Sequence, residues 1–117
     1  MKLFQSELKV MHVLWKEGDM TAKRISDLLK EQVGWNKNTT YTLIKRCIGK
    51  GAIERREPNF LCHALIPKEE VQEQELTEMI DRMFDGSVPL LFASLLHHKR
   101  LSKDEIEKLK QIVEELG

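Results

Sequence analysis

The chain has few cysteines, no long apolar run and no net charge, and each shortage argues against a class of protein. Its two cysteines, Cys47 and Cys62, fall on different predicted elements and form no CxxC pair, which argues against a disulfide framework and indicates reduced thiols. No apolar run approaches the roughly 18 residues of a membrane-spanning helix, and the start carries no signal-peptide pattern. We therefore expect a cytoplasmic protein without a membrane segment.

Catalytic and metal-binding patterns are also scarce. The four histidines stand in no setting that predicts a catalytic site, so we expect neither an enzyme nor a cofactor. A metal site from Cys47, Cys62 and His63 is conceivable, but Cys62 and His63 are neighbours on a predicted strand and point to opposite faces. Cys47 fits better as a small core residue.

The zero net charge conceals an uneven distribution. Residues 1–66 contain 12 lysines and arginines against 7 acidic residues, whereas residues 67–117 contain 7 against 12. This split predicts a basic part that meets an anion and an acidic part with another task. Because 117 residues can bury one modest core plus an appended piece, we divide the chain into a domain at residues 1–66 and a segment at residues 67–117.

The stretch Trp35–Gly51 predicts a helix with two different faces. Spacings of three and four residues gather one stripe for a core, whereas the other face is polar and basic, and no acidic residue occurs from Asn36 to Ala52. Amides, hydroxyls and cations on an exposed helix reach base edges and phosphates of DNA. An ordinary solvated helix is the alternative. The stripe comprises Thr40, Leu43, Ile44, Cys47 and Ile48, and the candidate DNA contacts are Lys37, Asn38, Thr39, Tyr41, Thr42, Lys45 and Arg46.

Each side chain on the polar face has an expected role. Arg46 and Lys45 would contact guanine edges or phosphates, whereas the shorter Thr42 and Asn38 suit base edges or a thymine methyl group. Thr39 would cap the helix or bond a phosphate, next to the backbone amides of the helix start. Tyr41 would either hydrogen-bond a phosphate or pack at the helix rim.

Two predicted helices precede this stretch and a predicted hairpin follows it. The first helix covers Gln5–Lys16, and the second is capped by Thr21 and ended by Gly34. Two short β-like runs, 52–57 and 60–65, flank the turn pair Pro58-Asn59. Three helices and a hairpin are the order of a winged helix-turn-helix, in which the hairpin is the wing. Its first strand carries Arg55 and Arg56, which would lie along the sugar-phosphate backbone.

Three more helices are predicted in the second segment. The first covers Lys68–Phe84, Ser87 caps the next, and Ser102 with Glu105 forms a capping box for the last. So much apolar surface in about fifty residues cannot close a core alone, so we expect it to be buried against another copy of the chain. The expected dimerisation residues are Leu76, Met79, Ile80, Met83, Phe84, Leu91, Leu95, Ile106, Leu109 and Val113.

Several motifs along the chain occur in a specific order. They are Leu8–Trp15, Trp35–Arg46, the Lys50-Gly51 turn into Ile53, Phe84–Ser87 and Leu101–Ile106. In order and spacing the chain resembles the penicillinase-repressor family, the BlaI/MecI/CopY type of bacterial transcriptional repressor, over essentially its whole length. The resemblance implies a mainly α fold with a small β-hairpin, a winged-helix head, a three-helix dimerisation segment and a homodimer on a palindromic DNA operator.

The resemblance also assigns roles to single positions of the head. Thr39, Thr42 and Arg46 fall where family members contact operator bases or phosphates. Tyr41 falls at a position that varies among members, so it would tune the choice of operator.

The family's known release mechanisms fit this chain less well. Its copper-responsive branch ends in a cysteine-rich tail, whereas Cys62 is the last cysteine here. Its β-lactam branch is cleaved, through a sensor protease, at an Asn-Phe bond that matches Ser94-Leu95, with Leu91-Phe92 the nearest bond to a phenylalanine. Two other readings are a winged-helix module that binds a protein, and a metal- or thiol-responsive regulator that uses Cys47 and Cys62.

Overall fold

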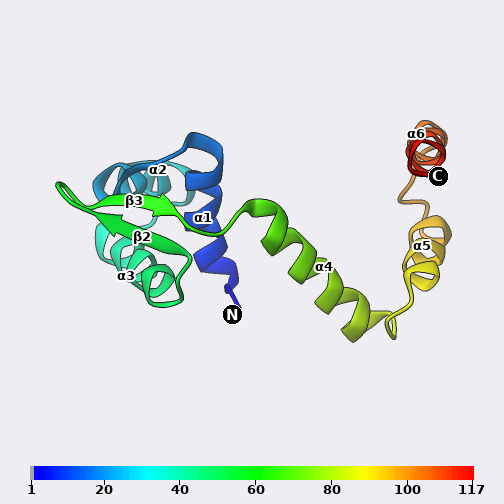
Figure 1. Cartoon of the computed structure of the whole chain (residues 1–117), viewed down its shortest axis with the longest axis horizontal. Helices are drawn as coiled ribbons and strands as arrows, with labels where there is room; N and C mark the ends of the chain where they lie inside the picture. Colours follow the sequence, from blue (N-terminus) through cyan, green and yellow to red (C-terminus); the bar gives the residue numbers. More distant parts are fainter. Residues whose placement is uncertain (1) are drawn as a thin grey trace. The chain divides into compact units, whose positions relative to one another are not determined.

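A computed structural model describes residues 2–117, and it is mainly helical with one small antiparallel sheet (Figure 1). The prediction of a mainly α fold with a wing is confirmed. In chain order the elements are α1 (Gln5–Glu17), β1 (Met20–Thr21), α2 (Ala22–Val33), α3 (Lys37–Gly49), β2 (Ile53–Arg56), β3 (Leu61–Ala64), α4 (Lys68–Met83), α5 (Val88–His97) and α6 (Lys103–Leu116).

Short polar side chains and glycine set most helix ends. The Thr21 hydroxyl accepts the Arg24 N–H at 3.1 Å at the start of α2, and Gly34 ends this helix in the left-handed region with φ 76°. The Ser87 hydroxyl likewise accepts the Leu90 N–H at 3.2 Å, and Ser102 and Glu105 form the predicted capping box of α6. These caps were all predicted. The fourth helix, however, ends at Met83, one residue before the predicted end.

The sheet contains three strands, so the expectation of a two-stranded hairpin was incomplete. The strand order is β1-β3-β2, with Met20 opposite Cys62 and Ile53 opposite Ala64. Strand β1 has only two residues, too few to show an alternating pattern in the sequence. It occupies the edge of β3 that the hairpin leaves open and connects the sheet to the start of α2.

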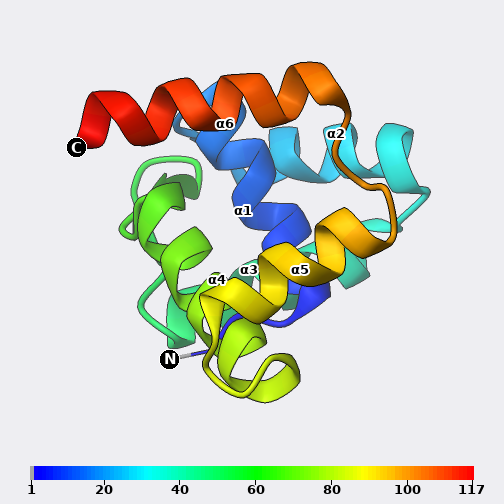
Figure 2. The same ribbon diagram turned by 90° about the vertical axis from the view of Figure 1, so that its right-hand side faces the viewer.

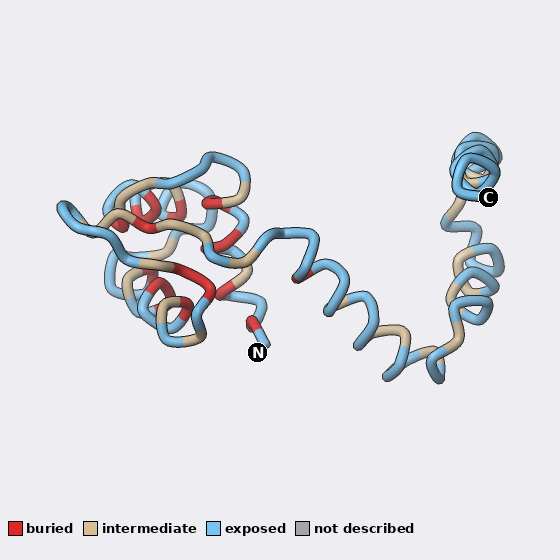
Figure 3. Tube along the Cα trace, viewed as in Figure 1, coloured by how far each residue is buried: buried red, intermediate tan, exposed pale blue. Residues whose placement is uncertain are grey.

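The head has one apolar core between α1, α2, α3 and the sheet (Figure 3). The Trp15 indole N–H donates to the Ile66 carbonyl at 2.9 Å, which ties the chain leaving the sheet to α1. Contacts divide the chain into one unit that ends at Gln72 and a second, Glu73–Gly117. Val71, in the first turn of α4, is buried with the head. The buried set is Leu3, Val10, Met11, Val13, Leu14, Ala22, Ile25, Leu29, Leu43, Ile44, Cys47, Ala52, Ile53, Cys62 and Val71.

The second unit leaves most of its apolar side chains open. Helices α5 and α6 (Figure 2) contain no buried residue. Among the expected dimerisation residues, the exposed fraction reaches 50% for Leu76, 65% for Met83 and 67% for Val113. No helix within residues 2–117 is both long enough and apolar enough to cross a membrane. The remaining expected dimerisation residues, Met79, Ile80, Phe84, Leu91, Leu95, Ile106 and Leu109, are partly exposed.

Candidate nucleic-acid interface

Helix α3 begins at a cap that differs from the expected one. The Asn36 side chain accepts the Thr39 N–H at 2.9 Å, and Asn36 has the extended backbone of an N-cap residue. Thr39 is therefore not the cap, which corrects one of its two expected roles. Asn36 thus satisfies the backbone amide of Thr39, a residue of the first turn whose N–H has no partner within the helix. The side chain of Thr39 lies at an exposed position.

The two faces of α3 are separated as the sequence predicted. Thr40, Leu43, Ile44 and Cys47 are buried, and Ile48 is partly buried. This stripe packs against α1 and α2, so the opposite face is held outward by the core. Every expected contact on that face except Tyr41 is exposed, namely Lys37, Asn38, Thr39, Thr42, Lys45 and Arg46.

A hollow of about 430 Å³ runs along this outward face. The structure brings Asn38, Thr39, Thr42 and Arg46 together in it, whereas Lys45 does not line it. Three of its residues were missed from sequence, because they precede α3 or come from α1 and belong to no periodic pattern. The missed residues are Ser6, Trp35 and Asn36.

A second hollow, of about 270 Å³, separates α2 from the start of α3. Lys23 and Lys30 line it together with Lys37 and Tyr41. Seven residues are two helical turns, so Lys23 and Lys30 share one side of α2, a signal that the sequence did contain. Cations therefore flank α3 on the side of α2 as well as on its own exposed face.

The wing places its two arginines on opposite faces of the sheet. Arg55 lies opposite Cys62 and its Nε donates to Glu57 Oε1 at 2.6 Å. Arg56 lies opposite Leu61, its Nε donates to Glu54 Oε1 at 2.6 Å, and its Nη1 is 3.9 Å from Asp19 Oδ2. Neighbouring strand residues alternate in direction, so the two arginines would approach a sugar-phosphate backbone from different faces of the sheet.

The ion pairs of the wing keep their carboxylates charged. The hydrogen bond from Arg56 lowers the pKa of Glu54, and that from Arg55 lowers the pKa of Glu57. Exposed ion pairs of this kind contribute little to stability, because solvent screens the two charges. A DNA phosphate can therefore replace either carboxylate as the partner of its arginine.

The sensing site considered for Cys47, Cys62 and His63 has no support in the geometry. Residues 2–117 contain no group of three or more histidine, cysteine, aspartate or glutamate side chains placed to hold a metal ion. His63 Nδ1 instead lies 2.8 Å from Asp19 Oδ1. Both thiols are buried, and burial raises the pKa of Cys47 to about 12 and that of Cys62 to about 11.

Both cysteines are expected to be unreactive in the folded protein. Raised pKa values leave almost no thiolate at pH 8, and the thiolate is the reactive form. Ellman's reagent should therefore modify the native chain at least roughly 100-fold more slowly than the chain in urea, where the thiols regain ordinary pKa values near 8.5. Rapid modification of one thiol in the native protein, followed by absorbance, would contradict the buried assignment.

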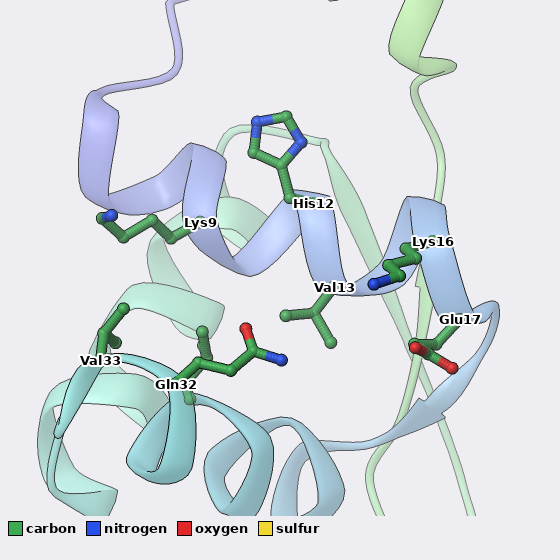
Figure 4. A pocket seen from close by; sticks show the side chains of 8 residues that line it. Lys9, His12, Val13, Lys16, Glu17, Gln32 and Val33 are labelled. Carbon is green, nitrogen blue, oxygen red and sulfur yellow. The ribbon is translucent and has the colours of Figure 1, made fainter.

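A third hollow, between α1 and α2, lies away from α3 (Figure 4). It combines Lys9 and Lys16 with apolar Val13 and Leu29. The His12 ring points away from α2, and it packs edge-on against Trp15 with ring centroids 5.3 Å apart. His12 is thus on the outer side of α1, as its sequence position predicted.

Both bonds of the possible cleavage region lie inside a helix. Leu91-Phe92 and Ser94-Leu95 belong to α5, where the backbone is hydrogen-bonded. Proteolytic nicking concentrates at exposed loop tips, so cleavage at either bond would require α5 to unwind.

Comparison with known proteins gives consistent similarities. The protein-family model described as Penicillinase repressor matches residues 3–115. The methicillin resistance regulatory protein MecI of Staphylococcus aureus (strain N315) is 27% identical over 114 residues, 96% of this chain and 93% of MecI. The Penicillinase repressor of Bacillus licheniformis is 27% identical over 116 residues, 97% and 91% of the two chains. The solution structure of the DNA binding domain of the repressor BlaI is similar with a TM-score of 0.55 and 25% identity, covering 59% of this chain and 87% of that domain.

Proposed function

The chain belongs to the penicillinase-repressor family, and we propose that it represses transcription by binding a palindromic DNA operator as a homodimer. Helix α3 enters the major groove and the wing follows the adjacent backbone. The second unit pairs with its counterpart and so brings two copies of α3 to sites about one helical turn of DNA apart. An inducing signal releases the repressor.

The exposed face of α3 is the observation that carries this proposal. It combines amides, hydroxyls and cations, and the buried stripe holds it outward from the core. In the hollow along this face, Thr42 and Asn38 are short enough for base edges and Arg46 is long enough for a bidentate contact to guanine. The lysines at the α2 side, Lys23 and Lys30, supply phosphate contacts.

Replacing Arg46 by alanine is expected to weaken operator binding by about 2 kcal/mol, roughly 30-fold, because one bidentate base contact is lost. The operator for this test is a duplex that the wild-type protein enriches from a randomised library. Gel-shift titration with this duplex and with a random duplex of equal length separates specific from non-specific loss. Arg100→Ala, an exposed arginine of the second unit, is the matched control.

Two outcomes would contradict the assignment of Arg46. Unchanged affinity for the enriched duplex would remove it from the interface, and an equal loss on both duplexes would make it a phosphate contact only. A module that binds a protein instead of DNA is the competing function. Duplex binding through several phosphates weakens steeply between low and moderate salt, whereas an apolar protein interface responds little.

A further inference from the structure

Two adjacent aromatic rings with a cation at each end connect the wing to helix α3. The centre of the Arg55 guanidinium lies 3.7 Å from the centroid of the Phe60 ring. Phe60 in turn meets Tyr41 of α3 edge-on, with centroids 5.9 Å apart and planes at 88°. Lys37 Nζ lies 5.4 Å from the Tyr41 centroid at the other end. We call these four side chains, Lys37, Tyr41, Arg55 and Phe60, the Phe60 clasp.

Each contact of the clasp has favourable chemistry. A cation over a ring face is attracted by the ring quadrupole, and edge-on rings place a positive edge against a negative face. The Tyr41 ring packs at the helix rim against Phe60 of the wing. Strand β2 runs beside α3 in the same region (Figure 1).

The backbone of Phe60 is held in an unfavourable conformation. Its φ is 55°, and that of Asn59 is 71°, so two successive residues other than glycine occupy the left-handed region. This region is tolerated by asparagine but is an outlier for a bulky side chain. The Phe60 N–H donates to Glu57 Oε2 at 3.3 Å, and its carbonyl accepts the Ala22 N–H at 3.0 Å. A strained residue retained against its local preference is a candidate for a functional role.

The wing turn does not need a phenylalanine for its own geometry. Glycine adopts a positive φ without cost, and both backbone hydrogen bonds of residue 60 use groups that every residue except proline carries. What the phenylalanine adds is the ring, which packs at the edge of the head core and contacts Arg55 of the wing and Tyr41 of α3.

We propose that Phe60 is a positioning residue, which fixes the wing against α3 so that Arg55 and the exposed face of α3 meet the duplex in one preset geometry. This inference rests on the proposed function. The exposed Arg55–Glu57 ion pair is too weak to orient the arginine alone, whereas the ring beneath the guanidinium restricts it further. A wing fixed before binding loses less conformational entropy on the DNA, which favours affinity.

The test compares two substitutions that remove the ring but differ in backbone strain. Phe60→Ala keeps a Cβ in the left-handed region, whereas Phe60→Gly removes both the ring and the strain, so the glycine variant should unfold at the higher temperature. Both variants are expected to bind the enriched duplex about 10-fold more weakly than wild type, because cation–π and aromatic contacts of this size are lost. Phe60→Tyr, which keeps the ring, should bind like wild type.

Two controls separate positioning from general stability. Phe4→Ala removes an exposed ring outside the wing that also contacts a cation, Lys50 Nζ at 4.1 Å. It should leave duplex binding within about twofold, because surface substitutions away from the site have small effects. Arg55→Ala should weaken wild type but add little to Phe60→Gly, since the ring acts through that arginine.

The outcomes are distinct. Equal losses for the alanine and glycine variants, despite different melting temperatures, support the inference. If duplex affinity instead changes in step with melting temperature, so that Phe60→Gly binds like wild type, the inference is overturned and the proposed function stays intact. Failure of the wild-type protein to enrich any duplex contradicts the proposed function itself and the inference with it.

Discussion

Replacing Lys50 by methionine is expected to destabilise the head by about 3 kcal/mol, because it leaves the buried carboxylate of Glu7 without its counter-ion. Glu7 is 1% exposed, and its Oε1 accepts hydrogen bonds from Lys50 Nζ and from the Phe4 N–H, each at 2.7 Å. Its Oε2 has no hydrogen-bond partner within residues 2–117. We take the lower end of the usual range because Lys50 is 27% exposed. For a head of this size the loss lowers the melting temperature by more than roughly 10 °C.

A second substitution tests whether the charge of Glu7 is the cause. Glu7→Gln keeps the shape and removes the charge, so the double variant with Lys50→Met should be more stable than Lys50→Met alone. Lys45→Met, at an exposed lysine of α3, is the control and should change little. Urea unfolding of the wild type, the two single variants Lys50→Met and Glu7→Gln, the double variant and the control decides the point, and additive losses would show that the two side chains are not coupled.

The ion pair also makes a prediction about acid. Burial tends to raise the pKa of Glu7, but the hydrogen bonds from Lys50 and Phe4 and the charges of Lys50 and Arg46 outweigh it, so the pKa lies below its ordinary value of 4.5. A lowered pKa means that the carboxylate stabilises the fold above pH 4.5 and that this contribution is lost as the pH falls through the folded-state pKa. The stability advantage of wild type over Glu7→Gln should shrink over that interval.

Replacing Val113 by aspartate is expected to convert the proposed dimer to a monomer. Val113 is 67% exposed on α6, and with Phe92, Leu96 and Leu109 it lines an apolar hollow of about 390 Å³ in the second unit. A second copy that covers this face would have to bury the new carboxylate in a largely apolar surrounding, which costs several kcal/mol. Sedimentation should then report the monomer mass.

Loss of the dimer should lower operator affinity by a factor on the order of 100 or more, because two linked heads bind with an effective concentration that two separate heads lack. Gln111→Asp adds the same charge at an exposed polar position of α6 and should leave both mass and binding unchanged. A Val113→Asp protein that stays dimeric would move the interface away from α6. A monomer that binds a palindrome as tightly as wild type would contradict the paired mode of binding.

The predictions from sequence are most accurate for features that depend on residues close together in the chain. Helical periodicity identified the buried stripe of α3, from Thr40 to Cys47, because a side chain every three or four residues must share one face. Caps at Thr21, Ser87 and Ser102 were predicted because a short polar side chain satisfies amides only three residues ahead.

The errors occur where distant segments meet. Strand β1 exists because β3 has a free edge, and two residues contain no periodic signal of that pairing. The cap at Asn36 is a separate case, because both Asn36 and Thr39 suit a helix start and the sequence pattern alone did not choose between them.

The sequence by itself therefore determined the order of the elements, the two faces of α3 and the polar groups available to DNA, since these depend on spacing along the chain. Only the tertiary structure decided what those groups meet. It buried Glu7 against Lys50, joined Tyr41 to Phe60 across the wing and gathered Ser6 and Trp35 beside Arg46. Contacts between residues far apart in sequence depend on how the helices and sheet pack together, and no local pattern encodes that packing.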